Sequence, residues 1–440
     1  MKPQFLISSI GPGHGKTIFA MGLIHALRKR GMKVQPYKCG PEITDTQLLT
    51  LSADNEAVNL DEWITTYTHI QHTYNKYGEK ADACIIEGNG ALFDGYKRMQ
   101  GSSAEIAKLL NVPVVLLVNA RMAGYSIASI IYGFKHFHPQ VKIVGVVFNQ
   151  ITSSAHYSYL KEACFDAGVD CLGYLPYNAE FKLPSKHSSI TLTTKRTMDT
   201  QINLIADDIE KNGNINRLLM NCNRNFPCQY TLPYSSDIEA ETVIPTSQQI
   251  KIAIARDPAF NFIYKENIAR LSIYGKISYF SPVYGSDLPE ADLIYLPGGY
   301  PELFARQLHR RHKLKNALKE YAEKGGKILA ECGGMAFLGR SITAKEGGTS
   351  YEMCNILPLD FTINSKLNSG YRKMIYNGVE LRGYEFHYSA TNNAENSLIA
   401  TQATNIKGTN VDLPLYRYKN IIASYGHWYW GDKDILDLWK

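Results

Sequence analysis

A cysteine near the C-terminal end stands where a nucleophile is expected. Residues 328–334 form an apolar stretch that runs into Glu331-Cys332-Gly333-Gly334, which predicts a strand, a tight turn and a helix start. Such a turn lifts a side chain out of the sheet, and a helix start helps to lower the pKa of a thiol. The N–H of Gly333 is expected to donate to an oxyanion. A second donor is expected from Gly298 and Gly299, which follow another predicted strand.

A cysteine nucleophile needs a base. His427 is the preferred candidate, and His387 is the competing one. Glu331, beside the cysteine, is expected to belong to the same catalytic group. A single cysteine is more often a packed core residue, and a single histidine is more often structural. The Glu-Cys-Gly-Gly context nevertheless favours a Cys332–His427 pair that hydrolyses an amide through a covalent intermediate.

A second chemical signature lies near the start of the chain. A predicted strand is followed by a glycine-rich loop and a helical pattern, the order in which a phosphate-binding loop occurs. The strict signature has glycine where Ile10 stands, so the match is to the loop and its Gly-Lys-Thr ending. The residues expected to bind ATP are Gly11, Gly13, Gly15, Lys16 and Thr17.

Carboxylates at strand ends are the expected partners of this loop, because Mg²⁺–ATP is held by carboxylates as well as by phosphates. Glu87 ends an apolar strand and points to the edge where ligands of parallel sheets bind. Thr17, Glu42 and Glu87 are predicted to hold Mg²⁺. Asp45 and Asp94 are predicted to act in catalysis.

The bulk composition is that of an ordinary globular protein. The chain has 440 residues, a formal charge of +6 and no dense basic run, which argues against a nucleic-acid-binding protein. Its eight cysteines show no metal-site spacing and suit a reducing compartment. Neither a signal peptide nor a membrane span is expected, so the predicted location is the cytoplasm.

Two α/β domains are predicted. Apolar strands alternate with helical patterns in the first half and again in the second, which indicates parallel sheets covered by helices. The expected domains are 1–215 and 250–440, joined by a polar linker at 216–249. The second domain is expected to contain one helix over Glu302–Lys324, then strands with turns at Asn377-Gly378 and Arg382-Gly383.

Taken in order, these motifs resemble the cobyrinic acid a,c-diamide synthase family. The resemblance covers nearly the whole chain. It is carried by Gly15-Lys16-Thr17, Tyr37-Lys38-Cys39-Gly40-Pro41, Ile86-Glu87-Gly88, Leu92-Phe93-Asp94-Gly95, Pro184-Ser185-Lys186-His187, Gly298-Gly299-Tyr300-Pro301-Glu302, Glu331-Cys332-Gly333-Gly334 and Gly383-Tyr384-Glu385-Phe386-His387.

The resemblance implies a P-loop domain like that of dethiobiotin synthetase, followed by a class I glutamine amidotransferase domain. The implied reaction uses ATP to phosphorylate the a and c carboxylates of a corrin precursor, and ammonia from glutamine then displaces phosphate. ATP, glutamine and a tetrapyrrole polycarboxylate are the implied small-molecule partners, and a homodimer is an option. Substrate contacts are implied for Glu42, Ile43, Thr44 and His187. Many class I glutaminases carry glutamate two residues after the histidine; this chain has Tyr429.

The chain departs from the family near the implied substrate. It reads Gly40-Pro41-Glu42-Ile43-Thr44-Asp45 where the family has Gly-Pro-Asp-Tyr-(Ile/Leu)-Asp, and it has Lys186 in place of arginine. Hydrogenobyrinate and nickel-sirohydrochlorin therefore stay open as alternative substrates. A non-amidating corrinoid- or nucleotide-binding protein is a further alternative. A P-loop ATPase of the partitioning type would leave Cys332 unexplained.

Overall fold

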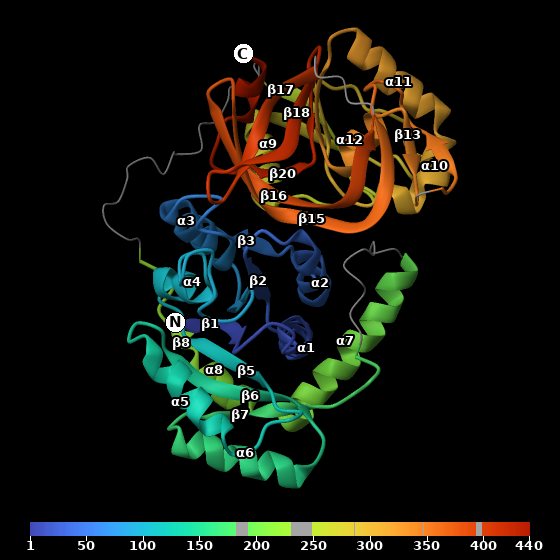
Figure 1. Cartoon of the computed structure of the whole chain (residues 1–440). Coiled ribbons are helices and arrows are strands. Elements are labelled where there is room, and N and C mark those ends of the chain that lie inside the picture. The colour runs from blue at the N-terminus through green and yellow to red at the C-terminus, as the bar shows by residue number, and fades with distance from the viewer. Residues whose placement is uncertain (182–191, 230–248, 286, 346, 393–397) are drawn as a thin grey trace. The chain divides into compact units, whose positions relative to one another are not determined.

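The structure, a computed structural model, describes residues 1–181, 192–229, 249–285, 287–345, 347–392 and 398–440 (Figure 1). The described residues up to 229 form one compact unit, and those from 249 onward form a second. The expected substrate residue His187 lies outside the described residues. No helix among the described residues is long and apolar enough to cross a membrane.

A parallel sheet forms the centre of the first unit. Its strand order is β3-β2-β4-β1-β5-β6-β7, and the short β8 pairs antiparallel with the start of β1. The strands are β1 (Lys2–Ser9), β2 (Val34–Cys39), β3 (Val58–Leu60), β4 (Ala83–Glu87), β5 (Val114–Asn119), β6 (Ile143–Ile151), β7 (Cys171–Pro176) and β8 (Asn223–Arg224). The central strands are buried on both faces, as their continuous apolar sequences predict.

Helices cover both faces of this sheet. α7 packs against α1 over Gly22, where an added methyl group would lie 2.3 Å from Ile205. On the opposite face, buried side chains of α3, α4, α5 and α6 share one apolar core with the sheet. The helices are α1 (Lys16–Lys29), α2 (Ile43–Ala53), α3 (Tyr67–Gly78), α4 (Ser103–Leu110), α5 (Ile127–Phe137), α6 (Ser154–Asp166), α7 (Leu192–Asn212) and α8 (Ile215–Asn221).

A mixed sheet forms the centre of the second unit. β10, β9, β11, β12 and β19 run parallel, and β18, β17, β15, β13 and β14 extend the sheet beyond β19. The strands are β9 (Ile250–Ala255), β10 (Gly275–Phe280), β11 (Leu293–Leu296), β12 (Lys327–Glu331), β13 (Ser341–Thr343), β14 (Ser350–Glu352), β15 (Asp360–Tyr376), β16 (Val379–Asn392), β17 (Ile399–Asn405), β18 (Asn410–Tyr418), β19 (Ile421–Ser424) and β20 (Gly426–Tyr429). β16 pairs with β15 and with β20, the strand that carries His427.

The expected single helix over Glu302–Lys324 is wrong. The segment is a short 3₁₀ turn at Pro301–Phe304, then α10 (Ala305–His309) and α11 (His312–Glu323). Leu308 and Leu314 are both fully buried. Six residues of continuous helix would turn Leu314 about 120° away from the face of Leu308. The break lets both leucines face the core. The remaining helices of this unit are α9 (Lys265–Tyr274) and α12 (Gly333–Leu338).

One of the two expected turns is correct. Asn377 and Gly378 both have positive φ angles, 48° and 76°, and connect β15 to β16 as a tight hairpin. The expected turn at Arg382-Gly383 is wrong, because both residues lie inside β16. Gly383 is needed there for a different reason. A methyl group at Gly383 would lie 2.0 Å from the carbonyl oxygen of His427 on β20.

Part of the expected linker is folded. α8 and β8 belong to the first unit, and the side-chain amide of Gln4 on β1 donates to the carbonyls of Arg224 and Asn225. Residues 230–248, the rest of the expected linker, lie outside the described residues.

Candidate active sites

The phosphate-loop candidates connect β1 to α1. Gly13 and Gly15 adopt left-handed φ angles of 75° and 89°. A methyl group at Gly15 would lie 2.2 Å from the Asn149 amide nitrogen, so the loop packs tightly on β6 at this point. At Gly13 no atom lies within 4 Å of the corresponding position. The loop therefore packs on Asn149 at Gly15 and leaves space beside Gly13, as a phosphate-binding loop requires.

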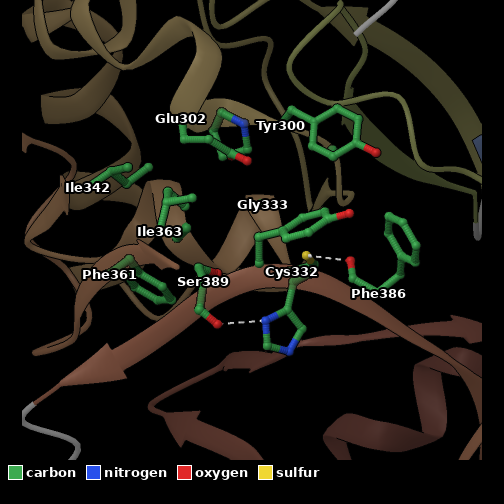
Figure 2. Close-up of a pocket in the computed structure, with 14 residues that line it drawn as sticks. Tyr300, Glu302, Cys332, Gly333, Ile342, Phe361, Ile363, Phe386 and Ser389 are labelled. Atoms are coloured by element: carbon green, nitrogen blue, oxygen red, sulfur yellow. Dashed lines mark hydrogen bonds between the residues drawn. The ribbon is translucent and has the colours of Figure 1, made fainter. Parts of the chain in front are cut away.

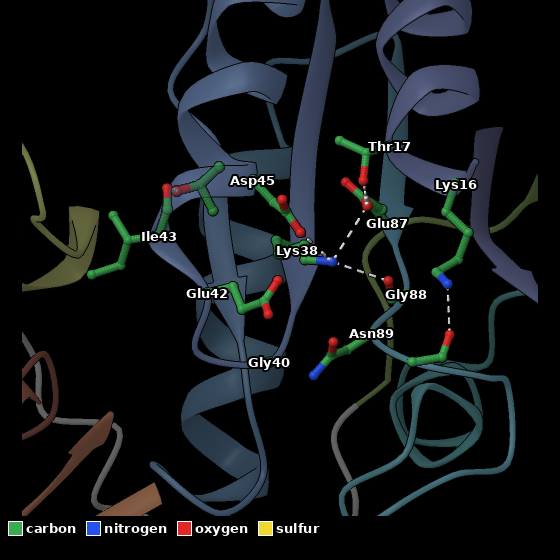
Figure 3. Close-up of polar contacts among 12 residues, drawn as sticks. Lys16, Thr17, Lys38, Gly40, Glu42, Ile43, Asp45, Glu87, Gly88 and Asn89 are labelled. Atoms are coloured by element: carbon green, nitrogen blue, oxygen red, sulfur yellow. Dashed lines mark hydrogen bonds and ion pairs between the residues drawn. The ribbon is translucent and has the colours of Figure 1, made fainter. Parts of the chain in front are cut away.

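Lys16 and Thr17 begin α1 and point toward the carboxyl ends of the neighbouring strands (Figure 3). The Lys16 ammonium donates to the Ser9 hydroxyl at 2.9 Å and to the Gly90 carbonyl at 2.6 Å. The Thr17 hydroxyl donates to Glu87 Oε1 at 2.6 Å. The Gly-Lys-Thr sequence and the acid that ends β4 are therefore brought together, as predicted from the sequence.

Sequence reasoning missed Lys38 as a site residue. Its side chain, which extends from β2, is 2% exposed and joins two of the predicted acids (Figure 3). The ammonium lies 3.1 Å from Asp45 Oδ2 and 3.4 Å from Glu87 Oε1, and donates to the Gly88 carbonyl at 3.0 Å. The sequence signal was present, because a lysine inside an otherwise buried strand needs a partner. The identity of that partner depends on the pairing of β2 with β4.

Burial and mutual attraction determine the charges in this cluster. Burial raises the pKa of Glu87 to about 7, against the opposing influence of Lys38 and Thr17. Burial alone would lower the pKa of Lys38, but the carboxylates of Glu87, Asp45 and Glu42 outweigh it and raise the pKa. For Lys16 the balance is reversed: burial and the nearby Lys38 lower its pKa. An anionic ligand would relieve the repulsion between these two lysines.

The remaining candidates of this unit are less uniform. Glu42 stands at the N-cap position of α2 without a side-chain capping hydrogen bond, Ile43 is buried, and Thr44 is half-buried. Asp94 is exposed, and no hydrogen bond or ion pair links its side chain to the cluster within the described residues.

The donors near the loop fit Mg²⁺ held together with phosphates. No group of three or more metal-ligating side chains occurs in the described parts of the chain. Glu87 Oε2, however, is buried and has no hydrogen-bond partner there, and its other oxygen accepts from the Thr17 hydroxyl. One carboxylate and one hydroxyl form an incomplete set of the kind that Mg²⁺ completes with phosphate oxygens and water.

Cys332 occupies a strained turn between β12 and α12. Its φ and ψ angles are 42° and −105°, an arrangement that costs a non-glycine residue about 1–3 kcal/mol. Its N–H donates to the Ser424 carbonyl at 2.7 Å, which anchors the turn to β19. Gly334 follows, where a methyl group would lie 2.1 Å from the Leu296 carbonyl. The sequence therefore forms the predicted nucleophile turn.

His427 and Cys332 both lie against Gly298. A methyl group at Gly298 would lie 2.0 Å from the His427 ring and 3.3 Å from Cys332 Cβ, so both residues flank this glycine. Gly333 likewise packs on Gly299, where its added methyl group would lie 3.1 Å from the Gly299 nitrogen. The predicted oxyanion residues Gly298, Gly299 and Gly333 are thus gathered around the thiol.

The competing histidine is committed to other contacts. His387 Nε2 lies 2.8 Å from Glu385 Oε1 and Nδ1 lies 2.7 Å from the Ser389 carbonyl, so both nitrogens face oxygen acceptors. Its ring stacks on Tyr425 at 3.7 Å. By contrast, neither ring nitrogen of His427 has a well-formed hydrogen bond within the described residues. His427 is therefore the ring that is available to take a proton.

The thiol faces a pocket whose lining includes His387 (Figure 2). The other lining residues come from the turns after β11 and β12, from α12, and from β13, β15 and β16. They are Gly299, Tyr300, Pro301, Glu302, Cys332, Gly333, Ala336, Ile342, Phe361, Ile363, Phe386, Tyr388 and Ser389. The Cys332 sulfur lies 3.9 Å from the Phe386 carbonyl. A small polar substrate that enters this pocket reaches the sulfur directly.

The helix start lowers the pKa of the Cys332 thiol, as expected, but other effects outweigh it. Burial raises the pKa of Cys332, the Glu302 carboxylate adds to this effect, and the N–H of Gly333 only partly opposes it. Burial and the nearby His387 lower the pKa of His427 to about 4. The pair is therefore a neutral thiol beside a neutral imidazole, and a neutral imidazole is the form that can accept a proton.

Glu331 points away from this pocket. Its carboxylate accepts from the Trp428 N–H at 3.0 Å and from the Tyr295 hydroxyl at 2.8 Å. Burial raises its pKa to about 8, although both donors favour the ionised form. The structure does not place this carboxylate among the groups that face a substrate.

Comparison with known proteins supports the two-domain interpretation. Residues 5–190 match the CobQ/CobB/MinD/ParA nucleotide-binding domain, and residues 251–435 match the CobB/CobQ-like glutamine amidotransferase domain. A cobyrinate a,c-diamide synthase of Dehalococcoides mccartyi strain 195 is 36% identical, with 98% of this chain and 95% of that protein covered. Synthases of the same name from Priestia megaterium and Saccharolobus solfataricus are 33% and 30% identical, with 97% and 96% of this chain and 94% and 97% of those proteins covered. The expected fold class, a P-loop α/β domain followed by an amidotransferase α/β domain, is confirmed.

Proposed function

Because the chain belongs to the cobyrinate a,c-diamide synthase family, a family of glutamine-dependent amide-forming ligases, we propose that it uses ATP to amidate the a and c carboxylates of cobyrinate. One observation carries the proposal. The chain combines a phosphate loop that ends in Lys16-Thr17 with a nucleophile turn at Cys332, in a sequence aligned over 98% of its length with a synthase of that name.

The proposed first step occurs at the phosphate loop. Lys16 would bind the outer phosphates of ATP, and Thr17, Glu42 and Glu87 would hold Mg²⁺, which would neutralise phosphate charge during transfer. A substrate carboxylate attacks the γ-phosphorus, ADP leaves, and an acyl phosphate forms. Ammonia then attacks the acyl carbon, and phosphate leaves to give the amide. Glu42, Asp45 and Asp94 are proposed to act near the reacting carboxylate, and Ile43, Thr44 and His187 are proposed to contact the ring.

The proposed second site supplies the ammonia. His427 takes the Cys332 proton as the sulfur attacks the side-chain amide carbon of glutamine, and the N–H groups of Gly333 and Gly299 stabilise the resulting oxyanion. The same imidazole then returns the proton to the departing ammonia. Water hydrolyses the thioester to glutamate and restores the thiol.

The test is mass spectrometry of cobyrinate incubated with the protein, ATP, Mg²⁺ and glutamine labelled with ¹⁵N in its side-chain amide. We expect two labelled amides per ring and release of ADP, phosphate and glutamate. Unchanged cobyrinate would contradict the proposed substrate. Hydrogenobyrinate and nickel-sirohydrochlorin, tested in parallel, would then identify the alternative ring, because the family acts on polycarboxylates and the segment 42–46 departs from its pattern.

The second candidate function is binding of a corrinoid or nucleotide without amidation. The altered residues in 42–46 and 88–91 favour it. Calorimetric binding of cobyrinate without ADP release would support this alternative, and labelled amide in the product would eliminate it.

A further inference from the structure

The histidine of the cysteine site has no side-chain partner that orients it. In three-residue glutaminase sites a carboxylate two residues after the histidine performs this task, and Tyr429 stands there in this chain. Neither nitrogen of the His427 ring has a side-chain hydrogen-bond partner within the described residues, although the backbone of Phe386 lies close enough to favour the protonated ring and so to raise its pKa. A ring in a site as buried as this one (1% exposed) still has to be held, because misplacing a catalytic group by about 1 Å can cost about 10²-fold in rate.

Two buried side chains hydrogen-bond to the backbone beside His427. The N–H of Trp428 donates to Glu331 Oε1 at 3.0 Å, and the carbonyl of Trp428 accepts from Asn267 Nδ2 at 2.8 Å. Asn267 Oδ1 also accepts from the N–H of Trp430 at 2.9 Å. Glu331 and Asn267, which are 1% and 0% exposed, therefore hold the two peptide groups of β20 that flank Trp428.

Tyr295 completes the network. Its hydroxyl donates to Glu331 Oε2 at 2.8 Å. A buried carboxylate is costly unless donors satisfy it, and here each oxygen of Glu331 has one donor. Glu331 directly precedes Cys332 in the chain. The same residue thus links the turn of the nucleophile to the strand of the base, which fixes the distance between them.

We propose that Glu331 and Asn267 are positioning residues that hold His427 against Cys332 through the backbone of Trp428, in place of the carboxylate that orients the ring in three-residue sites. This inference rests on the proposed glutaminase role of Cys332 and His427. It changes the expected role of Glu331. The residue does not touch substrate, and it acts through the peptide group beside the base.

The test compares Glu331→Ala with Glu331→Gln in the full-length protein. The alanine variant is expected to lower kcat for glutamate release by about 10²-fold and to leave the KM for glutamine within about threefold, since Glu331 does not line the pocket. The glutamine variant keeps an oxygen that can accept the Trp428 N–H, and we expect kcat within about tenfold of wild type. Amidation driven by added ammonia is expected to be unchanged in both variants.

Two further variants separate positioning from general damage. Glu320→Ala removes an exposed carboxylate of α11 that pairs with Lys324, and it is expected to retain wild-type kcat. Tyr295→Phe leaves the contact between Glu331 and Trp428 in place, and it is expected to lower kcat for glutamate release less than Glu331→Ala does. Hydrogen exchange of residues 421–430 measures how firmly Glu331 and Asn267 hold the backbone of β20, and it does not depend on activity. We expect faster exchange at Trp428 in Glu331→Ala than in wild type or Glu331→Gln.

Several outcomes would overturn the inference. Wild-type exchange at Trp428 in Glu331→Ala would show that the carboxylate does not hold this strand. Equal loss of kcat in the alanine and glutamine variants would show that charge matters, and not the hydrogen bond. A wild-type protein that releases no glutamate would instead refute the proposed function. The exchange measurement would still show whether Glu331 holds the backbone of Trp428.

Discussion

The two candidate sites use opposite electrostatic designs. In the first unit, opposite charges compensate one another: Lys38 lies between Glu87 and Asp45. Burial and repulsion by Lys38 lower the pKa of Lys16. In the second unit, Cys332 and His427 are both held neutral by burial. The first arrangement suits a highly charged ligand, which completes the cluster. The second suits a neutral amide, whose attack creates charge only as the proton moves.

The largest effect is expected when the nucleophile of the neutral site, the Cys332–His427 pair, is removed. Cys332→Ala should lower glutamine-driven amidation at least about 10⁴-fold, because it removes the attacking sulfur and no second thiol is among the described residues that line the pocket. Amidation with ammonia should persist, since the charged site is untouched. Product formation with each nitrogen source, measured by mass spectrometry, makes the comparison. Loss of both activities would contradict the assignment of separate tasks to the two sites.

The second prediction concerns Lys38, the central residue of the charged site that it forms with Glu87 and Asp45. Lys38→Met leaves the buried Glu87 and the partly buried Asp45 without this cation, and we expect about 10³-fold less amidation with either nitrogen source. Unfolding of the first unit should become easier by about 3 kcal/mol. Glutamate release should continue, because Cys332 is unaffected.

Lys80→Met is the matched control for this variant, because Lys80 is exposed. It should behave as wild type in amidation and in unfolding. If Lys38→Met amidated normally, the buried lysine would be structural, and the charge balance described above would not serve the reaction.

The third prediction disturbs the geometry of the neutral site and leaves its chemical groups intact. The added methyl group of Gly298→Ala would lie 2.0 Å from the His427 ring, so the ring must move away from Cys332. We expect about 10²-fold slower glutamate release with unchanged ammonia-driven amidation. Gly133→Ala, whose methyl group meets no atom within 4 Å, provides the control. Normal glutamate release in Gly298→Ala would argue against His427 as the base.

The smallest effect concerns stability and pH. The pKa of His427 lies at about 4 in the folded protein, below the ordinary value of 6.5. Between these values the unfolded chain binds a proton that the folded site does not, so falling pH destabilises the fold, by on the order of 3 kcal/mol at the lower limit. In His427→Gln this contribution is absent. The Tm of the variant, measured by calorimetry relative to wild type, should therefore rise as pH falls from 6.5 to 4. A constant difference would show that the ring is not buried neutral.

The sequence predicted motifs better than it predicted their partners. The Gly-Lys-Thr loop and the Glu-Cys-Gly-Gly turn were identified because each needs only a few consecutive residues and a strand before them. Lys38 was overlooked because one of its partners, Glu87, is brought beside it only by the pairing of β2 with β4. Gly383 was mistaken for a turn because a glycine that permits close approach of two strands has the same local signature as a glycine that bends the chain.

By itself, the sequence determined where the phosphate loop, the cysteine turn and the strand-end acids lie, because these are local patterns fixed by backbone geometry. It also determined the fold class, through the periodicity of its apolar residues. Only the tertiary structure distinguishes the surroundings of His427 from those of His387, since it shows that the nitrogens of His387 are engaged by Glu385 and Ser389. Only it turned Glu331 away from the substrate pocket, because its partner Trp428 lies 97 residues further along the chain and is brought near by sheet packing.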